Sequence, residues 1–263
     1  MSQPSPSTPP PEHDLLRAAL REAGDAATIR FRRAEVSAKE DDTFVTDADH
    51  AAELILSARL REGWPNDGLV GEEGAAMSGD RTWFIDPIDG THAFLEGLAH
   101  WGPTVGLVGQ TASGDAEITL GATYFPRIDE FWFGARGAGA WRDGRRLPPL
   151  AEPVYDRRSV LFIPSRFHRW FESDHVGKCR SLGSTAAHLC LVAGGAAWAA
   201  FVPGGWGVWD VAGGLCLLEE VGGVARAFDG SSLDPLRDRG LPFLAGHPAA
   251  VERAIQSIRL RAP

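Results

Sequence analysis

The sequence predicts a mixed α/β fold in two adjoining halves. Helical periodicity near the N-terminus, short strand-like runs between residues 69 and 141, and alternating strands and helices after a proline-rich link at 148–153 support this prediction. With 263 residues, 44% of them hydrophobic, the chain can bury a large core. We place the boundary near Ala151, between an α+β half (12–150) and an α/β half (151–263).

The first half begins with two predicted helices. A Ser- and Pro-rich segment, residues 1–11, lacks the apolar core of a signal peptide and predicts a flexible tail. Helical spacing then predicts one helix from Glu12 to about Ala34 and a second from about Ala48 to Arg61, joined by a polar link over 36–46. Asp47 or Asp49 starts the second helix, where acidic groups suit the helix dipole. Its expected apolar face consists of Ala51, Leu54, Ile55 and Ala58.

Strand-like runs follow these helices. Residues 69–71 and 82–85 each run directly into acidic residues, so carboxylates should gather where the strands end. Between residues 101 and 141, turn residues separate further apolar runs, which predicts a meandering sheet. Its strands are expected at 104–108, 118–124 and 130–133.

The second half reads as alternating elements. We expect helices near Thr185–Ala193 and Val211–Val221. The strands expected around them are 160–163, 198–201 and 223–228.

The overall charge limits the classes of ligand. The formal net charge is −9, and no run of Lys and Arg is long enough to track nucleic acid. A phosphorylated substrate would be repelled unless local cations reversed the field, which favours a bound metal. Apolar stretches are too short for a membrane span, and the three cysteines indicate free thiols in a reducing compartment, so we expect a cytoplasmic protein.

Three acidic groups predict a site for a hard cation. They are Glu72 with Glu73, Asp86 with Asp89, and Asp210. Each alone is typical of a solvated pair, a turn or a helix cap, but together they offer the oxygen ligands that Mg²⁺ prefers.

The hexapeptide from Asp86 to Thr91 is the centre of this prediction. We interpret it as a turn that Pro87 stiffens and Gly90 relaxes, which lets the two carboxylates converge. The amides of Gly90 and Thr91 would face a phosphate if they open a short helix.

Several segments match the sequence pattern of a known protein family, both in their order and in their spacing. The match extends from about Leu15 to the C-terminus. The segments are Gly71–Glu73, Trp83–Thr91, Trp209–Gly213 and Glu220–Gly223, with weaker matches at Val45–Asp49 and Gly183–Ala187. The chain resembles the inositol monophosphatase family of lithium-sensitive, metal-dependent phosphatases. The resemblance implies a layered αβαβα sandwich of the inositol monophosphatase/fructose-1,6-bisphosphatase type and a homodimer.

The resemblance also implies roles for individual residues. Two or three Mg²⁺ ions would be bound by Glu72, Asp86, Asp89, Asp210 and the carbonyl of Ile88. Thr91, oriented by Asp49, would join Glu72 in activating the attacking water. Lys39 lies near a basic position of the family, although the local spacing is off by one residue. Gly183, Ser184 and Thr185 match a segment that contacts substrate in the family. We expect further substrate contacts at Asp89, Gly90, Thr91 and Asp210, and at His92, where the family varies and which is the better candidate of the two histidines, His92 and His188.

The substrate stays open because the sequence departs from the family pattern. Where relatives acting on inositol phosphate present a Glu, seven positions before Asp210, this chain has Pro203. Residues 90–97 look similar to the histidinol-phosphatase branch. We interpret Trp206 as a cover of the core, and His92 and His188 as surface or packing residues.

The sequence therefore predicts Mg²⁺-dependent hydrolysis of a small phosphorylated metabolite. Histidinol phosphate is an alternative substrate, and a regulatory protein that retains the fold is an alternative function. A phosphoaspartate mechanism is disfavoured because Pro87 and Ile88 separate the two aspartates, whereas one residue separates those of the haloacid-dehalogenase motif.

Overall fold

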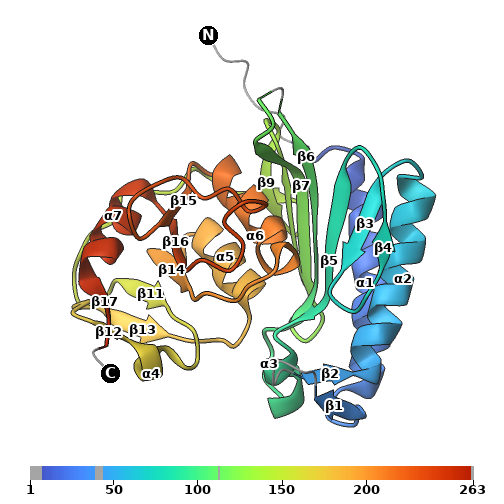
Figure 1. The fold of residues 1–263 in the computed structure, drawn as a ribbon, viewed down its shortest axis with the longest axis horizontal. Helices are drawn as coiled ribbons and strands as arrows, with labels where there is room; N and C mark the ends of the chain where they lie inside the picture. Colours follow the sequence, from blue (N-terminus) through green and yellow to red (C-terminus); the bar gives the residue numbers. More distant parts are fainter. Residues whose placement is uncertain (1–7, 39–43, 112, 262–263) are drawn as a thin grey trace.

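Five layers make up the fold in the computed structural model, which describes residues 8–38, 44–111 and 113–261 (Figure 1). Helices α1 and α2 cover one face of an eight-stranded sheet, and α5 and α6 lie between that sheet and a five-stranded one. The outer face of the second sheet carries α7. This order confirms the predicted αβαβα sandwich. The helix bounds are α1 Glu12–Arg30, α2 Asp47–Gly63, α3 Thr91–Glu96, α4 Phe167–Trp170, α5 Thr185–Ala193, α6 Val208–Glu220 and α7 Pro248–Ser257.

The apolar face predicted for α2 is wrong. Leu54 is 73% exposed, whereas Leu56 and Leu60 are fully buried. The helix is turned so that the buried carboxylate of Glu53 accepts hydrogen bonds from the amides of Glu73 and Ala75, both at 2.9 Å. The buried stripe of α2 is Ala48, Ala52, Leu56 and Leu60, and the anchored carboxylate of Glu53 lies beside it.

The link between α1 and α2 also differs from its prediction. Strands β1 (Val36–Ala38) and β2 (Phe44–Thr46) pair antiparallel there, and α1 ends at Arg30 rather than Ala34. Residues 1–7 of the predicted tail and Lys39 lie outside the described residues.

The eight-stranded sheet contains the predicted meander. Strands β5 to β10 follow one another in antiparallel order, while β3 is parallel to β5 and pairs with β4 at the sheet edge. The strands are β3 Gly68–Gly71, β4 Ala76–Met77, β5 Thr82–Asp89, β6 Gly102–Gln110, β7 Ala116–Phe125, β8 Glu130–Ala135, β9 Gly139–Arg142 and β10 Arg145–Arg146.

The five-stranded sheet has the order β13-β11-β14-β16-β15. It contains the three strands expected in the second half and two that the sequence reading missed, β13 and β16, and α7 was missed as well. A separate pair, β12 and β17, joins Phe171–Ser173 to Ile258–Leu260. The sheet strands are β11 Val160–Phe162, β13 Lys178–Arg180, β14 Ala199–Val202, β15 Val224–Ala227 and β16 Phe243–Gly246.

A row of glycines lets α6 lie directly on the first sheet. Gly106, Gly121 and Gly134 are cross-strand neighbours on β6, β7 and β8. A Cβ atom on Gly121 would lie 2.4 Å from the carbonyl oxygen of Gly213 in α6. Because a side chain at this position would collide with the helix backbone, the glycine row fixes how closely α6 approaches the sheet.

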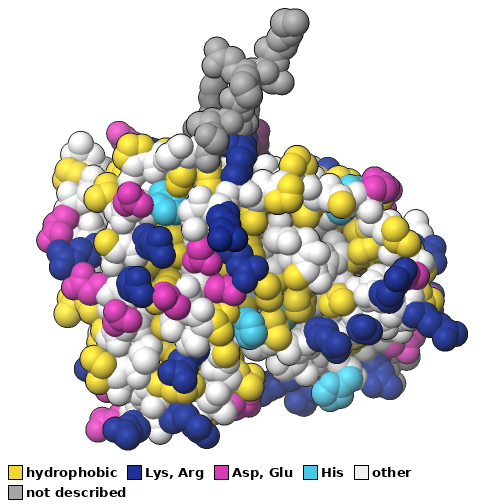
Figure 2. Space-filling view, turned by 180° about the vertical axis from the view of Figure 1, so that it is seen from behind, with side chains coloured by type: hydrophobic (Ala, Val, Ile, Leu, Met, Phe, Trp, Pro, Cys, Tyr) yellow, Lys and Arg dark blue, Asp and Glu magenta, His cyan; other side chains and the backbone are white. Residues whose placement is uncertain are grey.

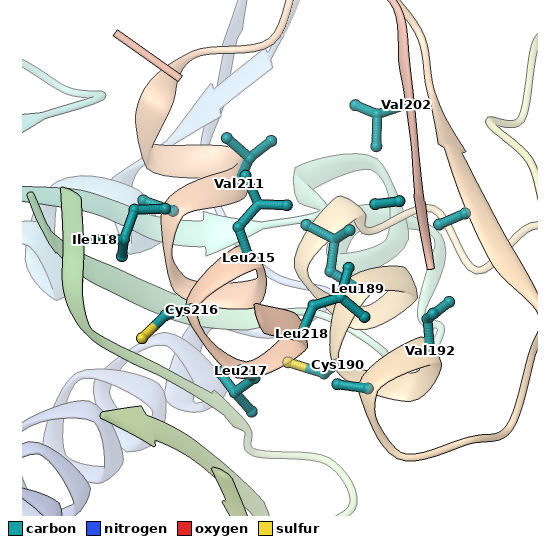
Figure 3. Close-up of a cluster of buried hydrophobic side chains, with 14 of the residues drawn as sticks. Ile118, Leu189, Cys190, Val192, Val202, Val211, Leu215, Cys216, Leu217 and Leu218 are labelled. Carbon is teal, nitrogen blue, oxygen red and sulfur yellow. The ribbon is translucent and has the colours of Figure 1, made fainter. Parts of the chain in front are cut away.

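The opposite side of α6 packs on α5. Figure 3 shows Leu215 and Leu218 of α6 facing Leu189 of α5, within a cluster of buried side chains. Cys190 and Cys216 belong to this cluster as free thiols, and Cys179 is an exposed free thiol, as predicted.

Trp206 covers the core, as predicted. Its side chain packs edge to face on Phe243, and its Nε1 donates a 2.7 Å hydrogen bond to the Leu241 carbonyl. The residue is 7% exposed, which leaves its ring no open face to serve as a platform.

Charges of both signs lie side by side on the surface shown in Figure 2, without a continuous basic stripe on that face. Within the described ranges, no helix is both long enough and apolar enough to cross a bilayer.

Candidate metal centre and active site

The first carboxylates meet because two parallel strands end together. β3 pairs with β5 so that Gly71 lies opposite Ile85, and the amide of Glu72 donates a 3.0 Å hydrogen bond to the Ile85 carbonyl. Glu72 therefore lies beside Asp86 at the carboxyl edge of the sheet. This confirms the expectation that acidic residues gather where these strands end.

The Asp86–Thr91 segment is mostly strand rather than the predicted turn. β5 extends through Asp89, and its pairing with β6 shifts register between Asp86 and Asp89. The Ile88 amide donates to Asp86 Oδ1 at 2.9 Å. Gly90, at φ +89°, then turns the chain into the short helix α3. The carboxylates of Asp86 and Asp89 are therefore oriented by an irregular strand and not by a turn.

Asp210 reaches the same place from the second half of the chain. It occupies the first turn of α6, where its Oδ2 accepts a 2.6 Å hydrogen bond from the Gly207 amide. The glycine row under α6 sets the depth of this helix, so it also sets the position of Asp210 relative to Asp86.

Glu72, Asp86 and Asp210 form a compact group of possible ligands. One carboxylate oxygen from each residue lies within 4.8 Å of the others. A donor set of oxygens alone suits Mg²⁺ better than zinc or copper. The residues therefore fit a hard divalent cation.

The charge state of the group supports the same fit. Burial raises the pKa of Asp86 well above its ordinary value, and neighbouring carboxylates raise it further. Burial, followed by the charges of Asp89 and Glu72, raises the pKa of Asp210 to about 8. The ionised groups repel one another in a poorly solvated place, and a cation would relieve that repulsion.

Asp89 lies beside this group but is held by α5. Ser184, the N-cap of α5, donates its hydroxyl proton to Asp89 Oδ2, and the Ala186 amide donates to the same oxygen at 2.8 Å. The Thr185 amide donates to Oδ1 at 3.2 Å. Burial outweighs these bonds and raises the pKa of Asp89 to about 6. The loop predicted to contact substrate thus also anchors a predicted metal ligand.

Asp49 and Thr91 have separate hydrogen-bond partners among the described residues. Asp49 Oδ2 accepts from the Thr46 amide at 2.8 Å and from the Thr46 hydroxyl, which caps α2, while Asp49 Oδ1 is buried without a partner in the described part of the chain. The Thr91 hydroxyl donates to the Ile88 carbonyl at 3.3 Å. Burial raises the pKa of Asp49 to about 7.

A cavity of about 160 Å³ opens beside Asp89, and we call it the inner cavity. Its walls include the predicted contact residues Gly183, Ser184 and Thr185, together with Pro203. His188 lines it too, but its Nε2 accepts a 2.9 Å hydrogen bond from the Leu182 amide, and burial lowers the pKa of His188 to about 4. The histidine is therefore a neutral packing residue, as predicted.

The sequence reading missed several residues around this cavity. Ser165 and Ser181 line it, and their hydroxyls lie 3.0 Å apart. Ser181 lies two residues before the predicted contact Gly183, so its closeness to that segment could have been read from the sequence, whereas Ser165 comes from a separate loop after β11 that only the folded structure brings to the cavity. His92, exposed on α3, lies with its ring 5.1 Å from that of Phe44 and does not line the inner cavity.

Known proteins share this fold and sequence pattern. A histidinol-phosphatase of Chlorobaculum parvum is 33% identical over 232 residues, which is 84% of this chain and 87% of that protein. A Nus factor SuhB of Pseudomonas aeruginosa is 31% identical over 245 residues, covering 82% of this chain and 86% of that protein.

A solved structure gives the same answer for the fold. The IMPase of Thermotoga maritima superposes with a TM-score of 0.80 at 25% identity, and the alignment covers 92% of this chain and 94% of that one. The sequence profile described as the inositol monophosphatase family matches residues 12–259. The chain belongs to the inositol monophosphatase family.

Proposed function

We propose that the protein is an Mg²⁺-dependent phosphatase of small phosphate monoesters. The observation that carries this proposal is the group of Glu72, Asp86 and Asp210, whose ligand atoms lie within 4.8 Å of one another. It lies beside a cavity that Asp89 lines, so a substrate in the cavity would have its phosphate next to the carboxylates. Family membership supports the reaction class.

The residues would divide the work as follows. Asp86, Asp210 and Glu72 bind the metal, and Asp89 and the Ile88 carbonyl extend the ligand set to two or three ions. Bound Mg²⁺ would lower the pKa of a water and neutralise charge on the phosphate. Glu72 and Thr91 orient the attacking water. The water oxygen would bond to phosphorus as the water loses a proton, the bond from phosphorus to the ester oxygen would break, and the released alkoxide would take up the proton that the water lost.

Asp49 would act through its neighbours. Its Oδ1 is a buried acceptor without a partner among the described residues, which suits it to receive a proton donor such as the Thr91 hydroxyl once substrate is bound. Gly90, His92, Gly183, Ser184 and Thr185 remain proposed substrate contacts, of which the last three line the inner cavity.

Asp210→Asn tests the metal centre. Asparagine preserves the size of the side chain and can still cap α6 through its oxygen, but it removes one charge. We expect kcat on p-nitrophenyl phosphate to fall at least 100-fold and calorimetric Mg²⁺ affinity to fall with it. Exposed Asp229→Asn is the matched control. Near wild-type activity in Asp210→Asn would contradict the proposal. If tens of millimolar lithium did not inhibit the wild-type enzyme, the proposal that it uses the lithium-sensitive mechanism of its family would be weakened.

The metabolite is a separate question. Pro203 offers no carboxylate to the cavity that it lines, so a substrate with many hydroxyls loses a partner there. A histidinol-phosphatase among the relatives supports histidinol phosphate as an alternative to inositol phosphate. We therefore propose a phosphomonoesterase whose pocket differs from that of inositol-specific enzymes.

Other expectations also remain proposals. We propose a cytoplasmic homodimer that binds a small phosphorylated metabolite rather than nucleic acid or membrane, with a boundary between its halves near Ala151. A regulatory role is the second candidate function, supported by the likeness to a Nus factor. Absent Mg²⁺ binding in calorimetry, together with a stable protein partner, would favour it.

A further inference from the structure

A second cavity continues from the inner one, and we call it the outer cavity. Its volume is about 490 Å³. Ser165, Ser181 and Gly183 line both cavities, so the two adjoin. A molecule whose phosphate lies near Asp89 could extend past the two serine hydroxyls into the outer cavity.

Opposite charges line the outer cavity without forming ion pairs. Glu96, the last residue of α3, and Arg166, which precedes α4, both lie on its wall. Neither has an ion-pair partner anywhere in the described ranges, and both residues are exposed. Glu96 also lies at the negative end of a helix, where an acid gains nothing from the helix dipole.

The inner cavity cannot provide this kind of recognition. Apart from Asp89, its polar groups are neutral hydroxyls and the buried, neutral His188, and Val202 and Pro203 are apolar. The outer cavity has three ionisable side chains on its wall, Glu96, Arg166 and His92. A substrate with opposite charges on its distal part would therefore find its counter-charges there, at Glu96 and Arg166.

We propose that Glu96 and Arg166 select a leaving alcohol that carries both an ammonium and a carboxylate, as in the phosphate ester of a hydroxy amino acid. The ammonium would donate to the Glu96 carboxylate, and the carboxylate would accept from the Arg166 guanidinium, whose planar fork suits it. This specificity rests on the proposed phosphatase function, because it places the phosphate at the metal centre.

Four phosphate monoesters test the proposal with the intact enzyme and Mg²⁺. O-phosphoserine carries both charges, phosphoethanolamine only the ammonium, phosphoglycolate only the carboxylate, and glycerol 2-phosphate neither. We expect kcat/KM to be highest for O-phosphoserine. In Glu96→Gln, the ratio of phosphoethanolamine to glycerol 2-phosphate should fall about tenfold. In Arg166→Gln, the ratio of phosphoglycolate to glycerol 2-phosphate should fall by a similar factor.

Matched control variants show whether a change in kcat/KM ratio comes from the cavity residue itself or from the loss of any surface charge. Glu172→Gln and Arg157→Gln change exposed residues that do not line either cavity, and they should leave all four ratios as in the wild type. Turnover of the esters with equal ratios in wild type, Glu96→Gln and Arg166→Gln would overturn the specificity proposal alone. No turnover of any ester, p-nitrophenyl phosphate included, would overturn the phosphatase function and this inference with it.

Discussion

Asp86 is 2% exposed, and the carboxyl groups of Glu72, Asp89 and Asp210 lie around it. Isolated buried carboxylates are unfavourable, since ionisation requires solvation or a counter-charge. Folding nevertheless brings these side chains together. The arrangement is explained if its purpose is to bind a cation, because a divalent ion replaces the lost solvation and cancels the repulsion.

The same residues predict how stability depends on pH when metal is removed. Burial is the main reason why the pKa rises to about 8 in Asp210, about 7 in Asp49 and about 6 in Asp89, from an ordinary value of 3.8. Between the ordinary value of 3.8 and the raised pKa of each group, the folded chain holds more protons than the unfolded chain. The free energy of unfolding therefore falls as pH rises through this interval. In a chelator, we expect Tm to decrease from pH 5.5 to pH 9.

Saturating Mg²⁺ should reduce that decrease, because it stabilises the ionised carboxylates. Asp210→Asn should make the decrease shallower at every pH up to about 8 and confine the remaining decrease to pH values below about 7, where Asp49 and Asp89 still titrate. A metal-free Tm that stays level or rises over this range would contradict the raised pKa values.

Helix α6 is the element that joins the proposed metal centre to the fold. Its first turn carries Asp210, and its body lies on the first sheet over the row of Gly106, Gly121 and Gly134. A small change in the depth of this helix would move Asp210 relative to Asp86. The glycine row is therefore a positioning device, although none of its members touches the site.

Gly121→Ala tests this device. Its Cβ would lie 2.4 Å from the Gly213 carbonyl oxygen and 2.7 Å from the Cys216 Cβ, so the helix must shift. We expect a loss of about 1–3 kcal/mol in urea unfolding and weaker Mg²⁺ binding by calorimetry. Gly109→Ala on β6 is the matched control, because its Cβ would meet nothing closer than Arg81 Cγ at 3.6 Å. Equal Mg²⁺ affinity in the two variants would show that α6 does not position Asp210.

Both halves of the molecule contribute to one site. Glu72 and Asp86 lie near the ends of strands of the eight-stranded sheet. Asp210 lies on α6, which follows strand β14 of the five-stranded sheet in the sequence. A ligand bound by all three residues stabilises only the state in which both halves are folded and packed together. Metal binding should then link the unfolding of the two sheets.

This linkage predicts a common response to Mg²⁺. At 100 times its Kd, the ion should add about 2.7 kcal/mol to the free energy of unfolding. In a protein with exposed Cys179 replaced by serine, tryptophan fluorescence reports on both halves, and the thiol protection of buried Cys190 and Cys216 reports on the second half; both should show the same shift. A fluorescence transition with a phase that Mg²⁺ does not shift would show that the halves unfold separately and that the metal does not bridge them.

Local sequence determined a large part of this protein. Helical periodicity located α1, α2 and α5, strand-like runs located the meander, and the acidic motifs pointed to Glu72, Asp86 and Asp210, which the structure brings together. These features depend on neighbours along the chain or on short motifs, so they can be read without a structure.

Tertiary structure decided the rest, because it depends on contacts between distant residues. Glu53 is held by two amides near β3, and Asp89 is held by the N-terminus of α5. The glycine row and the outer cavity with Glu96 and Arg166 exist only once the layers are packed. The sequence by itself determined the family and its carboxylates, and packing decided how those carboxylates are aimed and which side chains surround the substrate.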